Sequence, residues 1–240
     1  MLNNARAAVV IPALNEERSI GLTLRGLPPG CAAETIVVDN GSDDRTGEEA
    51  ARHGARVIRE NRRGYGSACL AGLNALSDNI QIVAFLDADY SDDPSELPML
   101  LQPILDGEAE MTIGSRTLGE RERGALTPHA RFGNWLATRL IRLLWGVRFT
   151  DLGPFRAIRR DALERMQMRD TGHGWTVEMQ VKAAILKTPF VELPAAYRRR
   201  VGQSKISGTW IGSARAGFKI LSVIAYYWFV QGRFKRGSGA

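Results

Sequence analysis

Two carboxylates one residue apart, Asp87 and Asp89, directly follow an apolar run in this chain. The run, residues 82–86, is typical of a buried central strand in a parallel sheet, and ligands of open α/β sheets bind at the carboxyl ends of such strands. Carboxylates this close repel each other unless a cation lies between them, and their oxygens suit Mg²⁺ or Mn²⁺, which usually also carry substrate phosphates. The pair therefore indicates a nucleotide–metal site. The alternative is a simple turn before the helix that Pro94 begins.

The segments around this pair alternate between strand and helix patterns. Short strands are predicted at residues 7–12, 35–39, 56–59, 80–86 and 111–115. Helical spacing separates them at residues 20–27, 46–53, 67–76 and 94–105. This alternation predicts an α/β fold with a mainly parallel central sheet and helices on both faces.

Polar residues follow most of these strands, so one edge of the sheet is expected to collect the chemistry. The segment Gly64-Tyr65-Gly66-Ser67-Ala68-Cys69 does not fit the glycine motif of a dinucleotide-binding domain. Cys69 occupies the position of the third glycine, and the segment does not follow a strand directly. Gly64 and Gly66 either let the backbone approach a nucleotide or cap the next helix. We favour the backbone approach.

Seven segments occur in the order seen in family 2 glycosyltransferases, and the chain resembles that family from about Val9 to Lys205. They are Pro12-Ala13-Leu14-Asn15-Glu16, Val38-Asp39-Asn40-Gly41-Ser42, Gly64-Tyr65-Gly66, Leu86-Asp87-Ala88-Asp89, Gly114-Ser115-Arg116, Asp151-Leu152-Gly153-Pro154-Phe155-Arg156 and Arg200-Val201-Gly202-Gln203-Ser204-Lys205. The dolichyl- or polyprenyl-phosphate hexose synthases are the most similar. This resemblance implies a GT-A (nucleotide-diphospho-sugar transferase) fold, a nucleotide-sugar donor, a divalent metal and inversion at the anomeric carbon.

Three positions depart from that family's pattern. Asn40 replaces a second Asp, Tyr90-Ser91 replaces the Leu-Gln common in mannosyl enzymes, and Gly153-Pro154-Phe155 replaces Ser-Gly-Phe. These departures concern the nucleotide and the sugar, and they make UDP-glucose slightly preferable to GDP-mannose as the donor.

The resemblance also implies roles on the donor side. Asp87 and Asp89 would hold the diphosphate through Mg²⁺ or Mn²⁺, and Asp39 would contact the base or ribose. The expected nucleotide-sugar site comprises Pro12, Leu14, Glu16, Asp39, Gly64, Tyr65, Asp87, Ala88, Asp89 and Glu178, with Arg200 and Lys205 closing over the phosphates. Glu178, on a helix predicted over residues 175–186, either touches a sugar hydroxyl or is solvated.

The acceptor side needs cationic groups for a lipid monophosphate. Arg116 and Arg131 are the candidates, because a guanidinium binds two phosphate oxygens at once, and Asn134 would add a hydrogen bond. Such a phosphate is largely ionised at neutral pH, so it needs a strong general base less than a sugar hydroxyl does. Asp151 resembles the acid proposed as the general base in relatives. It would either act as that base or position the acceptor or the sugar, and the sequence favours neither role. The catalytic candidates are therefore Asp151, Asp89 and Arg116.

The charge and the cysteine content indicate the binding partner and the side of the membrane on which the protein works. Lys and Arg number 32 against 26 acids, a net charge of +6, and the excess lies in residues 116–148 and 197–236. We find no nucleic-acid motif and no aromatic interleaving for stacking bases, so anionic lipid is the better partner. Two distant cysteines and no signal-peptide pattern indicate the cytosolic side of the membrane. The three scattered histidines, His53, His129 and His173, receive no role.

Two segments have amphipathic helical patterns. Residues 131–145 place Arg131, Trp135, Arg139 and Arg142 in one sector, opposite a half rich in leucine, and residues 210–231 repeat the theme with Tyr226-Tyr227-Trp228-Phe229. The apolar part of the second segment, residues 220–230, is well short of the ~20 residues of a spanning helix, so we expect it to lie in the membrane interface. The alternatives are helices packed on the domain surface or the seam of a homo-oligomer.

Together these patterns predict a catalytic domain over residues 1–207 and a C-terminal membrane-interface helix with a basic tail over 208–240. The expected function is transfer of a hexose from a nucleotide sugar to a polyprenyl or dolichyl phosphate by a peripheral enzyme on the cytoplasmic face of the cell membrane. One alternative is a family 2 enzyme acting on a soluble or polysaccharide hydroxyl, for which Asp151 or Glu178 would be an obligatory base. Another is a non-catalytic membrane scaffold, against which the acid pair argues.

Overall fold

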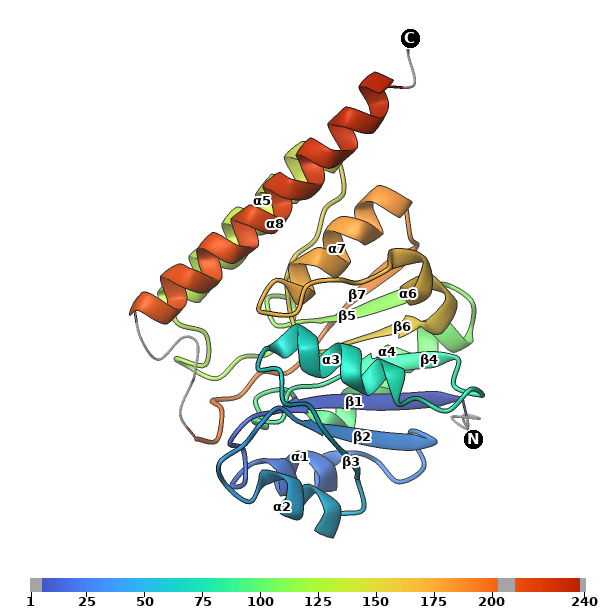
Figure 1. The fold of residues 1–240 in the computed structure, drawn as a ribbon, viewed down its shortest axis with the longest axis vertical. Coiled ribbons are helices and arrows are strands. Elements are labelled where there is room, and N and C mark those ends of the chain that lie inside the picture. The colour runs from blue at the N-terminus through green and yellow to red at the C-terminus, as the bar shows by residue number, and fades with distance from the viewer. Residues whose placement is uncertain (1–5, 203–209, 238–240) are drawn as a thin grey trace.

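The computed structural model describes residues 6–202 and 210–237, and its centre is a seven-stranded sheet in the order β3-β2-β1-β4-β6-β5-β7 (Figure 1). The strands are β1 (Ala7–Ala13), β2 (Glu34–Asp39), β3 (Arg56–Arg59), β4 (Ile82–Phe85), β5 (Met111–Ser115), β6 (Arg156–Arg159) and β7 (Phe190–Pro194). β1 pairs in parallel with β2 and β4, and β5 pairs in parallel with β7. The predicted mainly parallel α/β sheet is confirmed.

Strand β6 runs against both of its neighbours, β4 and β5. Its first residue therefore lies at the edge where the parallel strands end, and the segment that precedes it, Asp151 to Phe155, joins the polar strand ends there. The sequence pattern did not predict β6 or β7, because each is only four or five residues long and neither shows a regular apolar alternation.

Helices cover both faces of the sheet, as predicted. They are α1 (Ile20–Gly26), α2 (Thr46–Arg52), α3 (Tyr65–Asn74), α4 (Leu97–Leu105) after a short 3₁₀ turn (Pro94–Glu96), α5 (Pro128–Trp145), α6 (Arg160–Met166), α7 (Trp175–Leu186) and α8 (Trp210–Gly237). Successive strand residues point to opposite faces. Val10 thus packs in the core with α3, α5 and α7, whereas Val9 packs in the core with α1 and α4.

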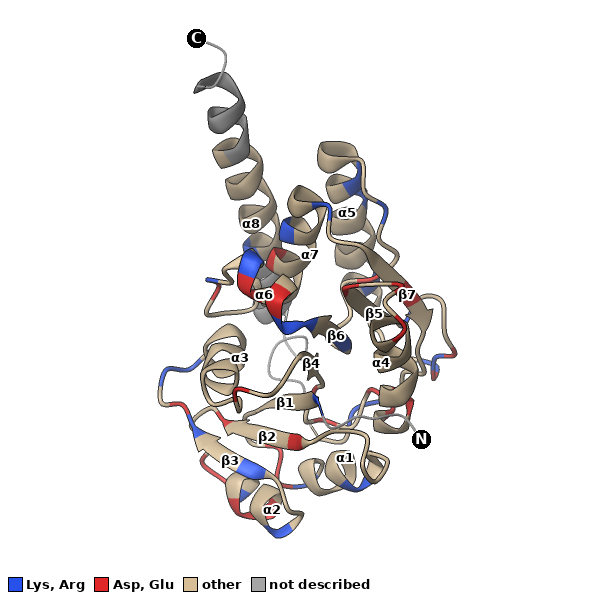
Figure 2. Cartoon of the chain, turned by 90° about the vertical axis from the view of Figure 1, so that its right-hand side faces the viewer, with Lys and Arg blue, Asp and Glu red and all other residues tan. Residues whose placement is uncertain are grey.

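Helix α5 has clear sequence signals at both ends. The Thr127 side chain caps the helix by accepting a hydrogen bond from the Ala130 amide, Pro128 occupies the first turn, and Gly146 ends the helix at a φ of 74°. α5 packs with α7 and α8, and α5 and α8 project together beyond the sheet (Figures 1 and 2). Within the described residues, every helix is too short or too polar to span a membrane.

Candidate active site

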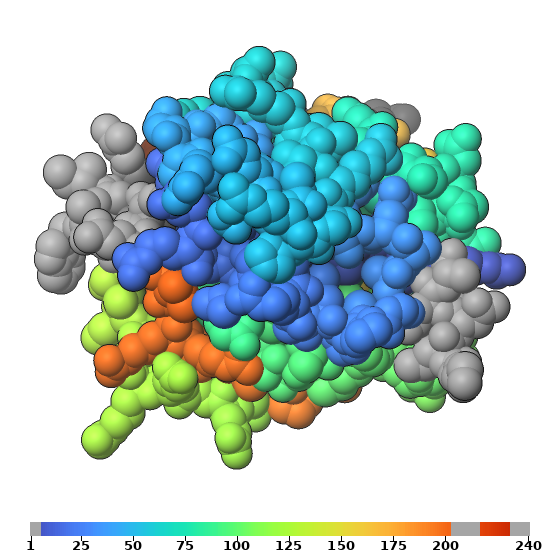
Figure 3. Space-filling view, turned by 90° about the horizontal axis from the view of Figure 1, so that it is seen from below, coloured from blue at the N-terminus to red at the C-terminus, as the bar shows by residue number. Residues whose placement is uncertain are grey.

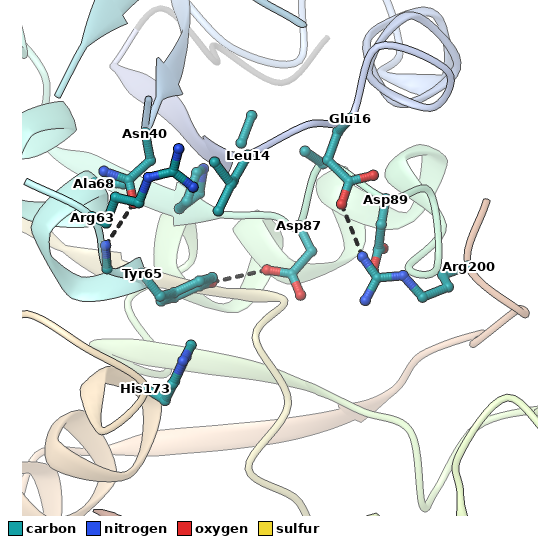
Figure 4. Close-up of a pocket in the computed structure, with 14 residues that line it drawn as sticks. Leu14, Glu16, Asn40, Arg63, Tyr65, Ala68, Asp87, Asp89, His173 and Arg200 are labelled. Atoms are coloured by element: carbon teal, nitrogen blue, oxygen red, sulfur yellow. Dashed lines mark hydrogen bonds and ion pairs between the residues drawn. The ribbon is translucent and has the colours of Figure 1, made fainter. Parts of the chain in front are cut away.

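A cavity of about 380 Å³ opens at the carboxyl ends of β1 and β4 (Figure 4). The start of α3 and the chain around Arg200 complete its wall. Nine of the predicted nucleotide-sugar residues line it: Pro12, Leu14, Glu16, Gly64, Tyr65, Asp87, Ala88, Asp89 and Arg200. Lys205 lies outside the described residues. The structure thus gathers one site from segments almost 190 residues apart in the chain.

Asp87 and Asp89 both line this cavity and have different partners. One oxygen of Asp87 accepts a hydrogen bond from the Tyr65 hydroxyl at 3.0 Å, and one oxygen of Asp89 accepts from the Ser91 amide and hydroxyl at 2.9 and 2.6 Å. Burial, and then repulsion from Asp89, raise the pKa of Asp87 to about 7. The two side chains therefore hold more negative charge than their surroundings neutralise.

Arg200 bridges the acid pair and the first strand. Its Nη2 atom lies 2.9 Å from Glu16 Oε1 and 3.2 Å from Asp89 Oδ2, and the next amide, that of Val201, donates to the Asp89 carbonyl at 3.0 Å. Figure 3 shows this part of the chain, in orange, at the surface between the N-terminal third and the yellow-green segment that follows β5. Arg200 therefore closes one end of the cavity over the acids.

The acid pair suits a divalent cation that is shared with a phosphate ligand. Across the described residues, no three His, Cys, Asp or Glu side chains lie close enough to form a complete metal site by themselves. Two carboxylates that repel each other, with a raised pKa on one, fit an ion that takes its other ligands from phosphate and water, as Mg²⁺ does.

Arg116 and Asp151 form a buried ion pair beside the acids. Arg116 Nε and Nη2 lie 2.7 and 2.8 Å from the two oxygens of Asp151, the Arg116 amide donates to the same carboxylate at 2.8 Å, and Asp151 is fully buried. Burial lowers the pKa of Arg116, but Asp151 outweighs it and raises that pKa above its ordinary value. Neither residue lines the cavity. As it lies, Asp151 holds Arg116 in place.

The structure adds two buried ionisable residues to which the sequence patterns assigned no role. Asp92 is 1% exposed, and neither of its carboxylate oxygens has a hydrogen-bond partner within the described part of the chain. Burial, and then the charge of Asp87, raise its pKa well above its usual range. Arg156 on β6 is fully buried and donates to the carbonyls of Gly153 and Thr176; burial lowers its pKa to about 10. The sequences around them, Ser91-Asp92-Asp93 and Phe155-Arg156, do not predict that these side chains are buried.

Asn40, rather than Asp39, lines the cavity. Its amide nitrogen donates to the carbonyls of Glu60 and Arg62, at 3.1 and 2.8 Å, while its oxygen accepts from the Gly64 amide at 2.7 Å. An ionised Asp has no donor for the two carbonyls, which explains the departure at this position. Asp39 accepts a hydrogen bond from the Ser42 amide and so shapes the turn behind Asn40.

Three further predicted residues also lie away from the cavity. Glu178 is 1% exposed and is neither solvated nor in the cavity: it pairs with Lys182 at 2.7 Å and accepts from the Tyr227 hydroxyl at 2.6 Å. Asn134 bonds to the backbone of Thr150 and Leu152, which ties α5 to the segment carrying Asp151. Arg131 lies exposed on α5.

Gly64 and Gly66 allow a close approach of the backbone of residues 170–172. A Cβ atom at Gly64 would overlap the carbonyl oxygen of Thr171, and one at Gly66 would overlap that of Asp170. Gly64 also has a φ of 142°, a value that disfavours other residues, and it precedes the first turn of α3. Both glycines therefore admit a neighbouring loop, and Gly64 also lines the cavity.

We expect the metal-free protein to lose stability as the pH rises from about 4 to about 7. The folded pKa of Asp87 is about 7 against an ordinary 3.8, so the folded state retains a proton that the unfolded chain releases. Asp92 adds a slope of the same sign. Urea unfolding in EDTA across this range should show a flatter slope for Asp87→Asn, whereas the exposed Asp106→Asn should match the wild type. Equal slopes for all three proteins would contradict the assignment.

Comparisons with known proteins agree on the family of this chain. The model of the family described as glycosyl transferase family 2 matches residues 8–167. A Mycobacterium tuberculosis protein named only as a glycosyltransferase is 38% identical over 90% of this chain and 97% of its own length. A dolichyl-phosphate hexose transferase of Haloferax volcanii is 33% identical over 90% of this chain and 92% of its own.

The fold also matches solved structures. Glucosyl-3-phosphoglycerate synthase from M. tuberculosis, in complex with uridine diphosphate, superposes with a TM-score of 0.71 at 25% identity, over 91% of this chain and 80% of that one. Another structure of the same enzyme holds Mn²⁺, uridine diphosphate and glucosyl-3-phosphoglycerate, with a TM-score of 0.70 at 24% identity, over 91% of this chain and 80% of that one. The expected GT-A fold is confirmed.

Proposed function

Because the chain belongs to glycosyltransferase family 2, we propose that it moves a hexose, glucose or mannose, from a nucleotide sugar to a polyprenyl or dolichyl phosphate, with inversion at the anomeric carbon. The observation that carries the proposal is the single cavity in which Asp87, Asp89, Arg200 and the Gly64-Tyr65 backbone meet. One end offers charge for a metal-bound diphosphate, and the other offers Asn40 and Arg63 for the nucleoside.

On the donor side, Asp87 and Asp89 would hold Mg²⁺ or Mn²⁺. A cation bound there would offset the negative charge that grows on the diphosphate when the bond to the sugar breaks. Arg200 would add a fixed positive charge at the same end, and its pairing with Glu16 keeps it oriented before the donor arrives. The uridine diphosphate and Mn²⁺ in the mycobacterial structures support a donor of this class, with UDP-glucose preferred over GDP-mannose.

On the acceptor side, α5 offers an exposed apolar and basic surface. Phe132, Trp135 and Leu143 are 60%, 52% and 79% exposed, and the Arg139 guanidinium lies 5.9 Å from the Trp135 ring. Figure 2 shows the basic residues along α5. Since Asn134 anchors the same helix to the segment of Asp151, a lipid held by α5 would bring its phosphate near Arg116, with Arg131 as the outer phosphate contact.

The same surface supports a peripheral position on a membrane, which we propose to be the cytoplasmic face of the cell membrane. Large apolar side chains of α8 are also exposed: Phe218, Leu221, Tyr226, Trp228 and Phe229. Soluble proteins rarely expose so many large apolar groups together. Basic residues next to such groups favour binding to anionic headgroups, as in other interfacial helices.

A soluble phosphorylated acceptor is the second candidate. The solved neighbour is named for transfer of glucose to phosphoglycerate, whose phosphate would meet the same cationic groups. In that case the apolar face of α5 would play no part in transfer.

An assay with each donor and each acceptor tests the proposal. UDP-glucose and GDP-mannose, with Mg²⁺ or Mn²⁺, are offered with undecaprenyl phosphate in anionic vesicles or with 3-phosphoglycerate. We expect transfer to the lipid only. Phe132→Ser with Trp135→Ser should lower vesicle binding and lipid transfer about tenfold or more and leave nucleotide affinity unchanged, since burying two aromatic rings contributes a few kcal/mol. Transfer to phosphoglycerate alone would reject the lipid acceptor.

A further inference from the structure

The loop that precedes α7 contributes one residue to the wall of the donor cavity. The loop comprises residues 169–174, and its His173 lines the cavity below Tyr65 and Asp87 (Figure 4). We propose that His173 binds the ribose–diphosphate part of the donor, and that Lys219 of α8 is a positioning residue that holds the loop in place. This inference rests on the proposed nucleotide-sugar donor.

The loop is attached to the donor-binding side through α3. The Gly66 amide donates to the Gly172 carbonyl at 3.1 Å, and the Ser67 amide donates to the Thr171 carbonyl at 2.9 Å. As described above, no side chain fits at Gly64 or Gly66 beneath these carbonyls. A shift of the loop would therefore move His173 and the backbone around Tyr65 together.

Asp170 organises the loop internally and joins it to α8. One of its oxygens accepts hydrogen bonds from the Gly172 and Gly174 amides at 2.8 and 3.0 Å, which fixes the turn on both sides of His173. Its other oxygen lies 2.6 Å from Lys219 Nζ, and Asp170 is 5% exposed in its side chain. Lys219 thus contacts the carboxylate that shapes the turn.

Helix α8 contacts the loop region along one stripe. Val223 approaches Gly174 so closely that a Cβ there would lie 2.8 Å from it, and the Tyr227 hydroxyl donates to Glu178, which in turn accepts from the Asp170 amide at 2.7 Å. Lys219, Val223 and Tyr227 are spaced by four residues, so they share a face of the helix. α8 therefore supports the loop at successive turns.

The position of His173 selects the part of the donor that it would meet. It lies below Tyr65 and Asp87, across the cavity from Leu14 and apart from Asp89 and Arg200 (Figure 4). Partial desolvation lowers the pKa of the imidazole, which is therefore neutral at pH 7 and can both donate and accept a hydrogen bond. Ribose hydroxyls and phosphate oxygens need such a partner.

Calorimetric binding of UDP and GDP to the full chain, with Mn²⁺, tests the first part. His173→Ala should weaken the preferred nucleotide about five- to tenfold, the value of one hydrogen bond, and His173→Gln should recover part of the loss. His53→Ala, outside the cavity, should bind as the wild type does. Unchanged affinity for His173→Ala would overturn the role of His173. If the wild type bound neither nucleotide, the proposed donor itself would fail.

A double-mutant cycle tests the second part. Lys219→Met should weaken the nucleotide about threefold or more, Lys219→Arg should restore it, and Ser222→Ala on α8 should have no effect. In the His173→Ala background, Lys219→Met should have a clearly smaller effect than in the wild type, because part of the effect of Lys219 passes through that ring and the rest through the backbone around Tyr65. An equal effect in both backgrounds, or none in the wild type, would overturn the positioning role. Thermal melting of each variant separates these results from loss of the fold.

Discussion

We expect Asp89→Asn to reduce hexose transfer by about a thousandfold or more and to abolish metal-dependent nucleotide binding. The carboxylate is proposed to share a cation with the diphosphate, and it also pairs with Arg200 at 3.2 Å. An amide keeps a hydrogen-bond acceptor for Ser91 but supplies no charge, so the fold should remain nearly unchanged. Turnover, calorimetric nucleotide binding with Mn²⁺ and thermal melting measure the three effects.

Asp87→Asn should act in the same direction and raise the stability of the metal-free protein at neutral pH, because it removes a repelled, partly buried carboxylate. Asp106→Asn, on the exposed end of α4, is the control for the loss of one negative charge. If Asp89→Asn turned over donor at the wild-type rate, the metal assignment of the pair would be wrong.

The second large effect concerns the buried pair of Arg116 and Asp151. Asp151→Asn should lower the free energy of unfolding by about 3–5 kcal/mol, because it leaves a buried guanidinium without its counterion. Transfer should fall with it, since Arg116 would lose the contact that holds it in place beside the proposed acceptor site. Urea unfolding and the initial transfer rate are the measurements.

Adding Arg116→Met to Asp151→Asn separates stability from function. The double variant should regain at least half of the lost unfolding free energy, because the uncompensated charge is gone, but it should not regain transfer. A double variant as unstable as the single one would show that Asp151 stabilises the fold through its backbone partner instead, the Arg116 amide at 2.8 Å. Recovery of transfer would remove Arg116 from the acceptor site.

Part of the cavity wall was predictable because two of its segments directly follow apolar strands. Asn15-Glu16 after β1 and the acid pair after β4 needed only the rule that parallel strands end at one edge. The helices α5 and α7 were also close to prediction. Helix α5 is a long periodic segment with clear end signals, and such segments depend little on the rest of the fold.

Other features depend on contacts between distant segments, which a local pattern does not contain. Glu178 has the spacing of an ordinary helix residue, and its burial results from Tyr227, 49 residues later. A lone histidine such as His173 gave no signal, since its place in the cavity depends on the pairing of Asp170 with α8. Strand β6 carries only a short apolar stretch, and a local pattern does not show in which direction a strand pairs with its neighbours. Its antiparallel direction could therefore not be predicted.

That reversal has an evolutionary consequence. Strands β5 and β6 are antiparallel neighbours, and residues 116–155 connect them. This connection therefore leaves the sheet and returns to it at the same edge. Lengthening such a connection costs free energy only with the logarithm of its length, and the strand pairing on either side is untouched. The exposed face of α5 can thus diverge, and the chain around it can lengthen, while the face packed against α7 and α8 is kept. A lineage could acquire a new acceptor in this way while inheriting its donor chemistry unaltered.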